Sequence, residues 1–113
     1  MMRLEKFGIS QQLTKTISLT LMVFCFWGCV STPPPIEDFT LARSAMDAAR
    51  VVESARYSPG YWHQAEEAYR RAQAYFREHE FAESKLEFQK ARQAAEKAEN
   101  SARLIRQKNG EVL

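Results

Sequence analysis

The sequence predicts an all-α protein, and three observations support this class. Small and apolar residues recur every three or four positions from Ile36 to Lys108, which is the spacing of one helix face. No stretch in this range alternates apolar and polar residues as a half-buried strand does. Two turn segments, Ser58-Pro59 and residues 77–80, divide the range into three parts. We therefore expect a three-helix bundle over residues 36–108, built as a long helical hairpin with one preceding helix.

Residues 1–28 have the pattern of a signal peptide. An apolar run from Ile17 to Cys29 follows a mainly basic segment, whose charged residues are Arg3, Glu5, Lys6 and Lys15. The run offers about eleven apolar residues, whereas a membrane-spanning helix needs about 20. A removable signal is therefore favoured over a permanent membrane span. An ordinary secretory signal and an uncleaved anchor are the alternatives.

The end of this run resembles the lipobox of bacterial lipoproteins, in which a cysteine after the cleavage site is acylated. Gly28 and Cys29 match the pattern, while Phe26 and Trp27 stand where Leu and a small residue are usual. The resemblance implies cleavage between Gly28 and Cys29, and a Cys29 that carries lipid such as palmitate. Two or more acyl chains hold a protein firmly on a membrane. Cys25 would leave with the signal, so that Cys29 is the only cysteine of the mature chain.

The charge balance changes when the signal is removed. The whole chain has 16 basic and 14 acidic residues, and 13 of each remain after residue 28. A neutral mature chain lacks the basic surplus that attracts nucleic acid or anionic lipid. We therefore expect no nucleic-acid partner.

Residues 29–35 are predicted to be the lipidated cysteine and a Pro-rich tether. Pro33-Pro34-Pro35 favours an extended chain at about 3.1 Å per residue, so the tether reaches only about 20 Å from the bilayer. Val30 follows the cysteine, where Asp would retain a lipoprotein at the inner membrane. By resemblance to the enterobacterial sorting rule, this implies the periplasmic face of the outer membrane in a Gram-negative bacterium. The outer leaflet of the inner membrane is the alternative.

The first helix of the domain is predicted from Ile36 to Tyr57. Glu37 and Asp38 fall in its first turn, where the helix dipole favours acidic side chains. Its apolar stripe repeats at alternate spacings of four and three, through Leu41, Ala45, Ala48, Val52 and Ala55, and is widened by Ala42, Met46 and Ala49.

The second and third helices are predicted from Pro59 to about Glu78 and from Phe81 to Lys108. Ser58 is expected to cap the second helix, with Pro59 at its first position. The apolar face of this helix consists of Trp62, Ala65, Tyr69, Ala72 and Phe76. The third helix repeats Phe81, Ser84, Phe88, Ala91, Ala95, Ala98, Ala102 and Ile105, in a coiled-coil-like spacing. It should stop at Asn109-Gly110, which leaves residues 109–113 as a flexible tail.

The third helix is the longest of the three, at about 40 Å. We therefore expect the part from Ala98 onward to extend beyond its neighbours without a partner inside the chain. The core of small residues is also thin for a domain of this size. These two points predict that the helix binds an envelope protein or a second copy of the chain, through Ala91, Ala95, Ala98, Ala102 and Ile105.

Three segments of the mature chain resemble the small Ala-rich lipoproteins grouped as domain of unknown function 4398. These segments are Ala48-Ala49-Arg50, the Tyr57-Ser58-Pro59-Gly60-Tyr61-Trp62 stretch, and residues 76–81 with the alanines that follow. The resemblance covers roughly residues 38 to 104 and implies an envelope location and a helical structure, with no activity attached. The second hairpin also resembles a single tetratricopeptide unit, although those units stack in arrays.

Aromatic residues form one candidate ligand surface. Tyr61, Trp62 and Tyr75 lie on or beside the apolar stripe of the second helix, and exposed aromatic side chains often anchor partners. Packing in the core is the alternative reading of the same spacing.

Candidate metal and catalytic sites are weak. His63 and Glu67 are half of a possible metal site on one helix face, but His79 is expected at a left-handed turn position. The chain has no Gly-rich phosphate loop and no nucleophile–base pair near a turn. We therefore expect no metal, no cofactor and no enzymatic activity.

These observations lead to one functional expectation and one alternative. The chain is expected to be a membrane-anchored envelope lipoprotein that acts as a helical protein–protein interaction or structural module. The alternative is a binder of peptidoglycan or a small ligand through the aromatic edge formed by Tyr61, Trp62 and Tyr75.

Overall fold

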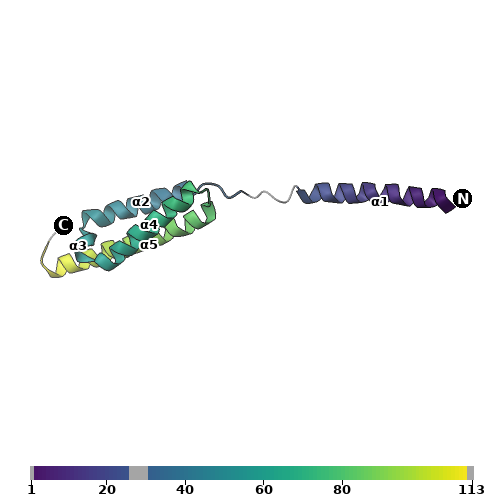
Figure 1. Cartoon of the computed structure of the whole chain (residues 1–113). Coiled ribbons are helices and arrows are strands. Elements are labelled where there is room, and N and C mark those ends of the chain that lie inside the picture. Colours follow the sequence, from purple (N-terminus) through teal and green to yellow (C-terminus); the bar gives the residue numbers. More distant parts are fainter. Residues whose placement is uncertain (1, 26–30, 112–113) are drawn as a thin grey trace. The chain divides into compact units, whose positions relative to one another are not determined.

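The computed structural model describes residues 2–25 and 31–111 of the 113-residue chain. Every regular element within these two ranges is a helix, which confirms the all-α prediction (Figure 1). The chain divides into two units, Met1–Ser31 and Thr32–Leu113.

The N-terminal unit contains one described helix, α1 (Met2–Cys25). It covers the basic segment and most of the apolar run that the sequence assigns to the signal peptide. Within the described ranges, no helix has both the length and the apolar character that crossing a bilayer requires. The predicted cleavage site, between Gly28 and Cys29, lies outside the described residues.

The C-terminal unit is built from α2 (Ile36–Val51), α3 (Ser54–Tyr57), α4 (Pro59–Arg77) and α5 (Phe81–Lys108). Helix α5 packs along both α4 and α2, whereas α2 and α4 contact each other mainly through long side chains. The last helix has the predicted bounds, and α4 ends one residue earlier than expected. Helix α5 is therefore the element on which the other helices of this unit assemble.

The predicted first helix is confirmed as far as Val51, but it does not continue to Tyr57, because the chain turns at Val52 and Glu53. Glu53 adopts a left-handed conformation with φ of 59°, and the short helix α3 follows it. Val52 is fully buried at the turn. Its burial explains why the apolar pattern continues through position 52 although the helix does not.

The buried face of α2 is also displaced from the predicted stripe by about one residue. Ala42, Met46 and Ala49 are buried, while Leu41 is 38% exposed and Ala55 is exposed. The three residues that were expected to widen the stripe therefore form its centre.

The loop between α4 and α5 is closed by His79, whose φ of 61° is in the left-handed region. The backbone N–H of Glu80 donates to the carbonyl of Tyr75 (2.9 Å), and that of His79 donates to Phe76 (3.2 Å). This pair of bonds is a Schellman motif, which satisfies the last carbonyls of a helix. The expected left-handed position of His79 is confirmed.

The end of α5 has the same motif with a glycine at the left-handed position. Gly110 has φ of 73°, and the N–H of Glu111 donates to the carbonyl of Arg106 at 2.9 Å. The Tyr57 hydroxyl also donates to Glu111 Oε2 at 2.5 Å. Residues 109–111 therefore close the helix rather than form a free tail, and residues 112–113 lie outside the described part of the chain.

Two adjoining clusters of mostly small residues form the core. The first contains the fully buried Phe88, whose ring meets Phe39 and Tyr69 edge-on at centroid distances of 5.4 and 5.6 Å. The second is centred on Met46 and is edged by Trp62. Alanines fill most other core positions and let the helices approach closely, namely Ala42, Ala49, Ala65, Ala68, Ala72, Ala91 and Ala95.

The predicted overhang of the last helix is also wrong. Ala98 and Ala102 have no solvent exposure. Helix α3 packs against α5, and the Arg106 guanidinium lies over the Tyr57 ring at 5.6 Å. The turn at Glu53 thus folds α3 over the part of α5 that a straight first helix would have left uncovered.

Candidate functional site

The predicted partner face of α5 is not available in the folded unit. Ala91, Ala95, Ala98 and Ala102 are each 0% exposed, because they form the seam on which α2, α3 and α4 pack. Ile105 is 36% exposed, and it is the one member of the predicted set that reaches the surface. The predicted seam is therefore buried, and within the described residues its partner is the rest of the same unit.

The surface that α5 offers instead is an outward row that we call the α5 outer stripe. Leu86 and Leu104 are 58% and 60% exposed and are separated by about five helical turns, so they lie on the same face. Exposed polar residues lie on the helix between them, and the stripe consists of Leu86, Lys90, Gln93, Lys97 and Leu104. Single exposed leucines are common on protein surfaces, so these two are distinguished only by the helix face that they share.

The predicted aromatic edge is not brought together as one surface. Tyr61 is 43% exposed, whereas Trp62 is half-buried against the second core cluster, with the Arg50 guanidinium over its ring at 5.6 Å. Tyr75 is half-buried and lies about 21 Å farther along the same helix. Tyr61 is therefore the member of the edge most available to a ligand.

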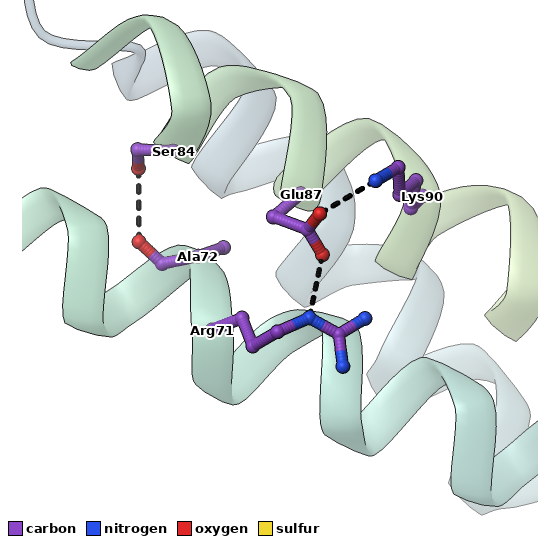
Figure 2. Close-up of polar contacts among 5 residues, drawn as sticks. All are labelled: Arg71, Ala72, Ser84, Glu87 and Lys90. Carbon is purple, nitrogen blue, oxygen red and sulfur yellow. Dashed lines mark hydrogen bonds and ion pairs between the residues drawn. The ribbon is translucent and has the colours of Figure 1, made fainter. Parts of the chain in front are cut away.

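A charged network that the sequence did not reveal joins α4 to α5. Glu87 is 9% exposed, and its two carboxylate oxygens accept hydrogen bonds from Arg71 Nε (2.9 Å) and Lys90 Nζ (2.6 Å), as Figure 2 shows. Burial alone would raise the pKa of the Glu87 carboxyl. The hydrogen bonds from Lys90 and Arg71 and their positive charges outweigh that effect, so the pKa lies below its ordinary value.

A second polar contact crosses the same interface close to the loop. The buried Ser84 hydroxyl donates to the backbone carbonyl of Ala72 at 2.9 Å (Figure 2). A small hydroxyl at this position satisfies its own polar group while it keeps the two helices close. Ser84 and Glu87 therefore fix how α4 and α5 align along their length.

A polar groove lies beside this network. It has a volume of about 290 Å³ and is lined by Gln64, Ala68, Arg71, Lys90, Gln93, Ala94 and Lys97. Its charged groups give it a positive character, although Glu87 neutralises part of that charge. The groove shares Lys90, Gln93 and Lys97 with the α5 outer stripe.

An apolar groove lies where the start of α2 meets the end of α4. It has a volume of about 260 Å³, and its lining residues are Ile36, Phe39, Gln73, Phe76, Arg77 and Phe88. Phe88 is 1% exposed and closes the bottom of the groove, whereas Ile36 is 57% exposed at its rim. The groove therefore joins the first core cluster to the surface.

The far end of α5 carries an ordered cluster of charged and aromatic groups. Arg106 lies 3.7 Å from carboxylate oxygens of both Glu53 and Glu111, and it stacks on Tyr57. The hydrogen bond to Glu111 is the main reason why the pKa of Tyr57 is raised. The cluster fastens α3 to the end of α5.

Within the described residues, no group of three or more His, Cys, Asp or Glu side chains is arranged to hold a metal ion. His63 Nε2 lies 3.3 Å from Glu67 Oε1, which is the half-site that the sequence suggested. His79 lies at the α4–α5 loop, where its ring is 5.6 Å from that of Phe81. The two histidines are therefore not brought together.

Comparisons of the chain with known protein families, with curated proteins and with solved structures gave no significant match.

Proposed function

We propose that the chain is an envelope lipoprotein, anchored through acylated Cys29, whose helical unit acts as a protein–protein interaction or structural module. In this proposal, residues 1–28 are the signal peptide and residues 29–35 are the tether. Residues 36–108 are a three-helix bundle with a hairpin like that of a tetratricopeptide unit. The protein faces the periplasm from the outer membrane, or from the outer leaflet of the inner membrane.

The main support for a lipid anchor is the basic segment followed by a short apolar run that ends in Gly28-Cys29. The division of the chain at Ser31/Thr32 supports it, because a self-contained helical unit begins three residues after Cys29. A unit with its own core remains intact when the preceding segment is removed.

The α5 outer stripe supports the interaction module. Its two leucines are exposed, while the core of the unit uses other residues of the same helix, namely Ala91, Ala95, Ala98 and Ala102. Substitution of an exposed leucine therefore changes the surface of the unit and leaves its core in place. We propose that Leu86 and Leu104 contact an envelope protein or a second copy of the chain.

In-cell crosslinking tests the module. A photoreactive residue at Gln93, between the two leucines, is expected to capture a defined protein or a second copy of this chain. Leu86→Glu with Leu104→Glu should abolish the capture, because a carboxylate is costly to bury in an apolar interface. The control is Val51→Glu, which adds one carboxylate at a residue that is 75% exposed on α2. Capture that persists in the leucine variant would contradict this assignment of the surface.

A second candidate function is supported by the polar groove and the exposure of Tyr61. The groove offers three cations and two glutamine amides, and the exposed Tyr61 precedes its residue Gln64 by about one turn of α4. Such groups bind the sugars and carboxylates of peptidoglycan. This candidate predicts co-sedimentation with purified sacculi, reduced in Tyr61→Ala and Lys97→Ala. The control is Lys85→Ala, an exposed lysine of α5 outside the groove. Equal sedimentation of all these proteins would exclude binding at this groove.

A further inference from the structure

The apolar groove has the composition of a site for one acyl chain. Its walls and floor come from Ile36, Phe39, Phe76 and Phe88, so nearly all of its surface is hydrocarbon. Its volume of about 260 Å³ is slightly below the range of about 300–1,000 Å³ typical of drug-sized ligands. The groove therefore has room for part of one flexible acyl chain.

The polar residues of the groove specify the head group of its ligand. Arg77 and Gln73 both line it, and Arg77 is exposed. In the part of the chain that the structure describes, the Arg77 guanidinium has no ion pair or hydrogen bond. A guanidinium binds a carboxylate with two parallel hydrogen bonds, and the Gln73 amide adds a further donor. Hydrocarbon beside one free cation is complementary to a fatty acid.

The position of the groove in the sequence agrees with such a ligand. Ile36 lies at the groove rim and is seven residues after Cys29. If Cys29 is anchored as proposed, the tether keeps this rim within about 20 Å of a bilayer, where fatty acids are concentrated. This step rests on the proposed function, whereas the composition and charge of the groove do not.

We propose that the apolar groove binds one fatty acid, with its acyl chain against Phe39, Phe76 and Phe88 and its carboxylate on Arg77. Entry at the exposed side of Ile36 brings the chain to Phe88 at the floor. The ligand then covers apolar surface that the helical unit leaves in contact with water.

Photocrosslinking on the full chain in phosphatidylcholine nanodiscs tests the proposal. The probe is palmitic acid that carries a diazirine and an alkyne, and mass spectrometry maps the adducts. Adducts are expected on the peptides that contain residues 36–39 and 73–77. Ile36→Asp should lower these adducts about tenfold, since it puts a carboxylate at the apolar entrance. Circular dichroism establishes that each variant is folded.

Two further measurements test whether the head group of the bound lipid is a carboxylate. Arg77→Gln should lower the palmitate adduct about tenfold and leave that of the matching long-chain alcohol unchanged, because only the acid uses the charge. The control is Arg70→Gln, an exposed arginine of α4 that does not line the groove. Displacement of the probe by a lysophospholipid but not by unlabelled palmitate would overturn the fatty-acid assignment.

Adducts spread over all helices, or adducts that Ile36→Asp does not change, would overturn the groove as a site. The assay does not need acylated Cys29. A missing groove adduct would therefore contradict the fatty-acid site alone, whereas an unmodified Cys29 in the natural membrane product would contradict the anchor alone.

Discussion

Glu87 is a charged residue in a position where helix periodicity alone would place a solvated side chain. Its carboxylate lies 9% exposed between α4 and α5, with one cation on each oxygen. Arg71 and Lys90 remain largely in water, with side chains 52% and 63% exposed, so the cost of burying charge falls mainly on Glu87. Burial of the Glu87 charge costs free energy, but the network holds α4 and α5 in one alignment along their length.

Glu87→Gln should reduce the dependence of stability on acid pH. Because the folded-state pKa of Glu87 is lowered, its contribution is complete above the ordinary carboxyl pKa of about 4.3. That contribution is lost as the pH falls through the lowered value. At pH 7 the variant is expected to lose about 1–2 kcal/mol of unfolding free energy, measured by urea denaturation.

The control for this experiment is Glu96→Gln, which removes the same charge from an exposed pair with Arg92. It should change the unfolding free energy by less than about 1 kcal/mol. If Glu87→Gln and the native protein lose equal stability between pH 7 and pH 3, the charged network does not stabilise the fold as described.

His79 occupies a backbone conformation that glycine adopts without strain. His79→Gly is therefore expected to raise the unfolding free energy, by up to about 1 kcal/mol after the entropic cost of glycine. His79→Ala keeps the strain and should give no gain. A glycine variant less stable than the alanine variant, in the same urea titration, would show that the contact of His79 with Phe81 outweighs backbone strain.

At the scale of the element, α5 has a buried side, where substitutions should destabilise the fold, and an exposed side, where they should have little effect on stability. Ala98 is 0% exposed, and a larger side chain there must push a neighbouring helix away. Ala98→Leu is therefore expected to cost about 1–3 kcal/mol of unfolding free energy. Gln93→Leu, on the exposed side of the same helix, should change stability by less than about 0.5 kcal/mol. Equal effects of the two changes in thermal denaturation would contradict the assigned burial.

The sequence predicts α4 and α5 well because their ends carry strong local signals. Pro59 occupies the first position of α4, although the Ser58 side chain does not make the expected capping hydrogen bond. The left-handed residues His79 and Gly110 follow the two helices. The break after α2 has no such signal. Glu53 is neither glycine nor asparagine, and the apolar pattern runs through Val52 without interruption.

At the scale of the whole helical unit, the missed break caused the wrong prediction of the partner face. A straight first helix would leave the end of α5 uncovered, whereas the turn at Glu53 places α3 against it. Burial of Ala98 and Ala102 is the consequence. The Glu87 network and both grooves depend on the alignment of α4 with its neighbours, which helix periodicity within one segment does not specify.

The most direct test of the proposed function is the mass of the mature protein. The mature protein is purified from the membranes of its natural host, and its intact mass is measured by mass spectrometry. The mass should correspond to a chain that begins at Cys29 and carries acyl groups on that residue. Cys29→Ala should abolish the modification and release the protein from the membrane fraction. A mature protein that begins at another residue, or that retains an unmodified Cys29, would contradict the lipid anchor.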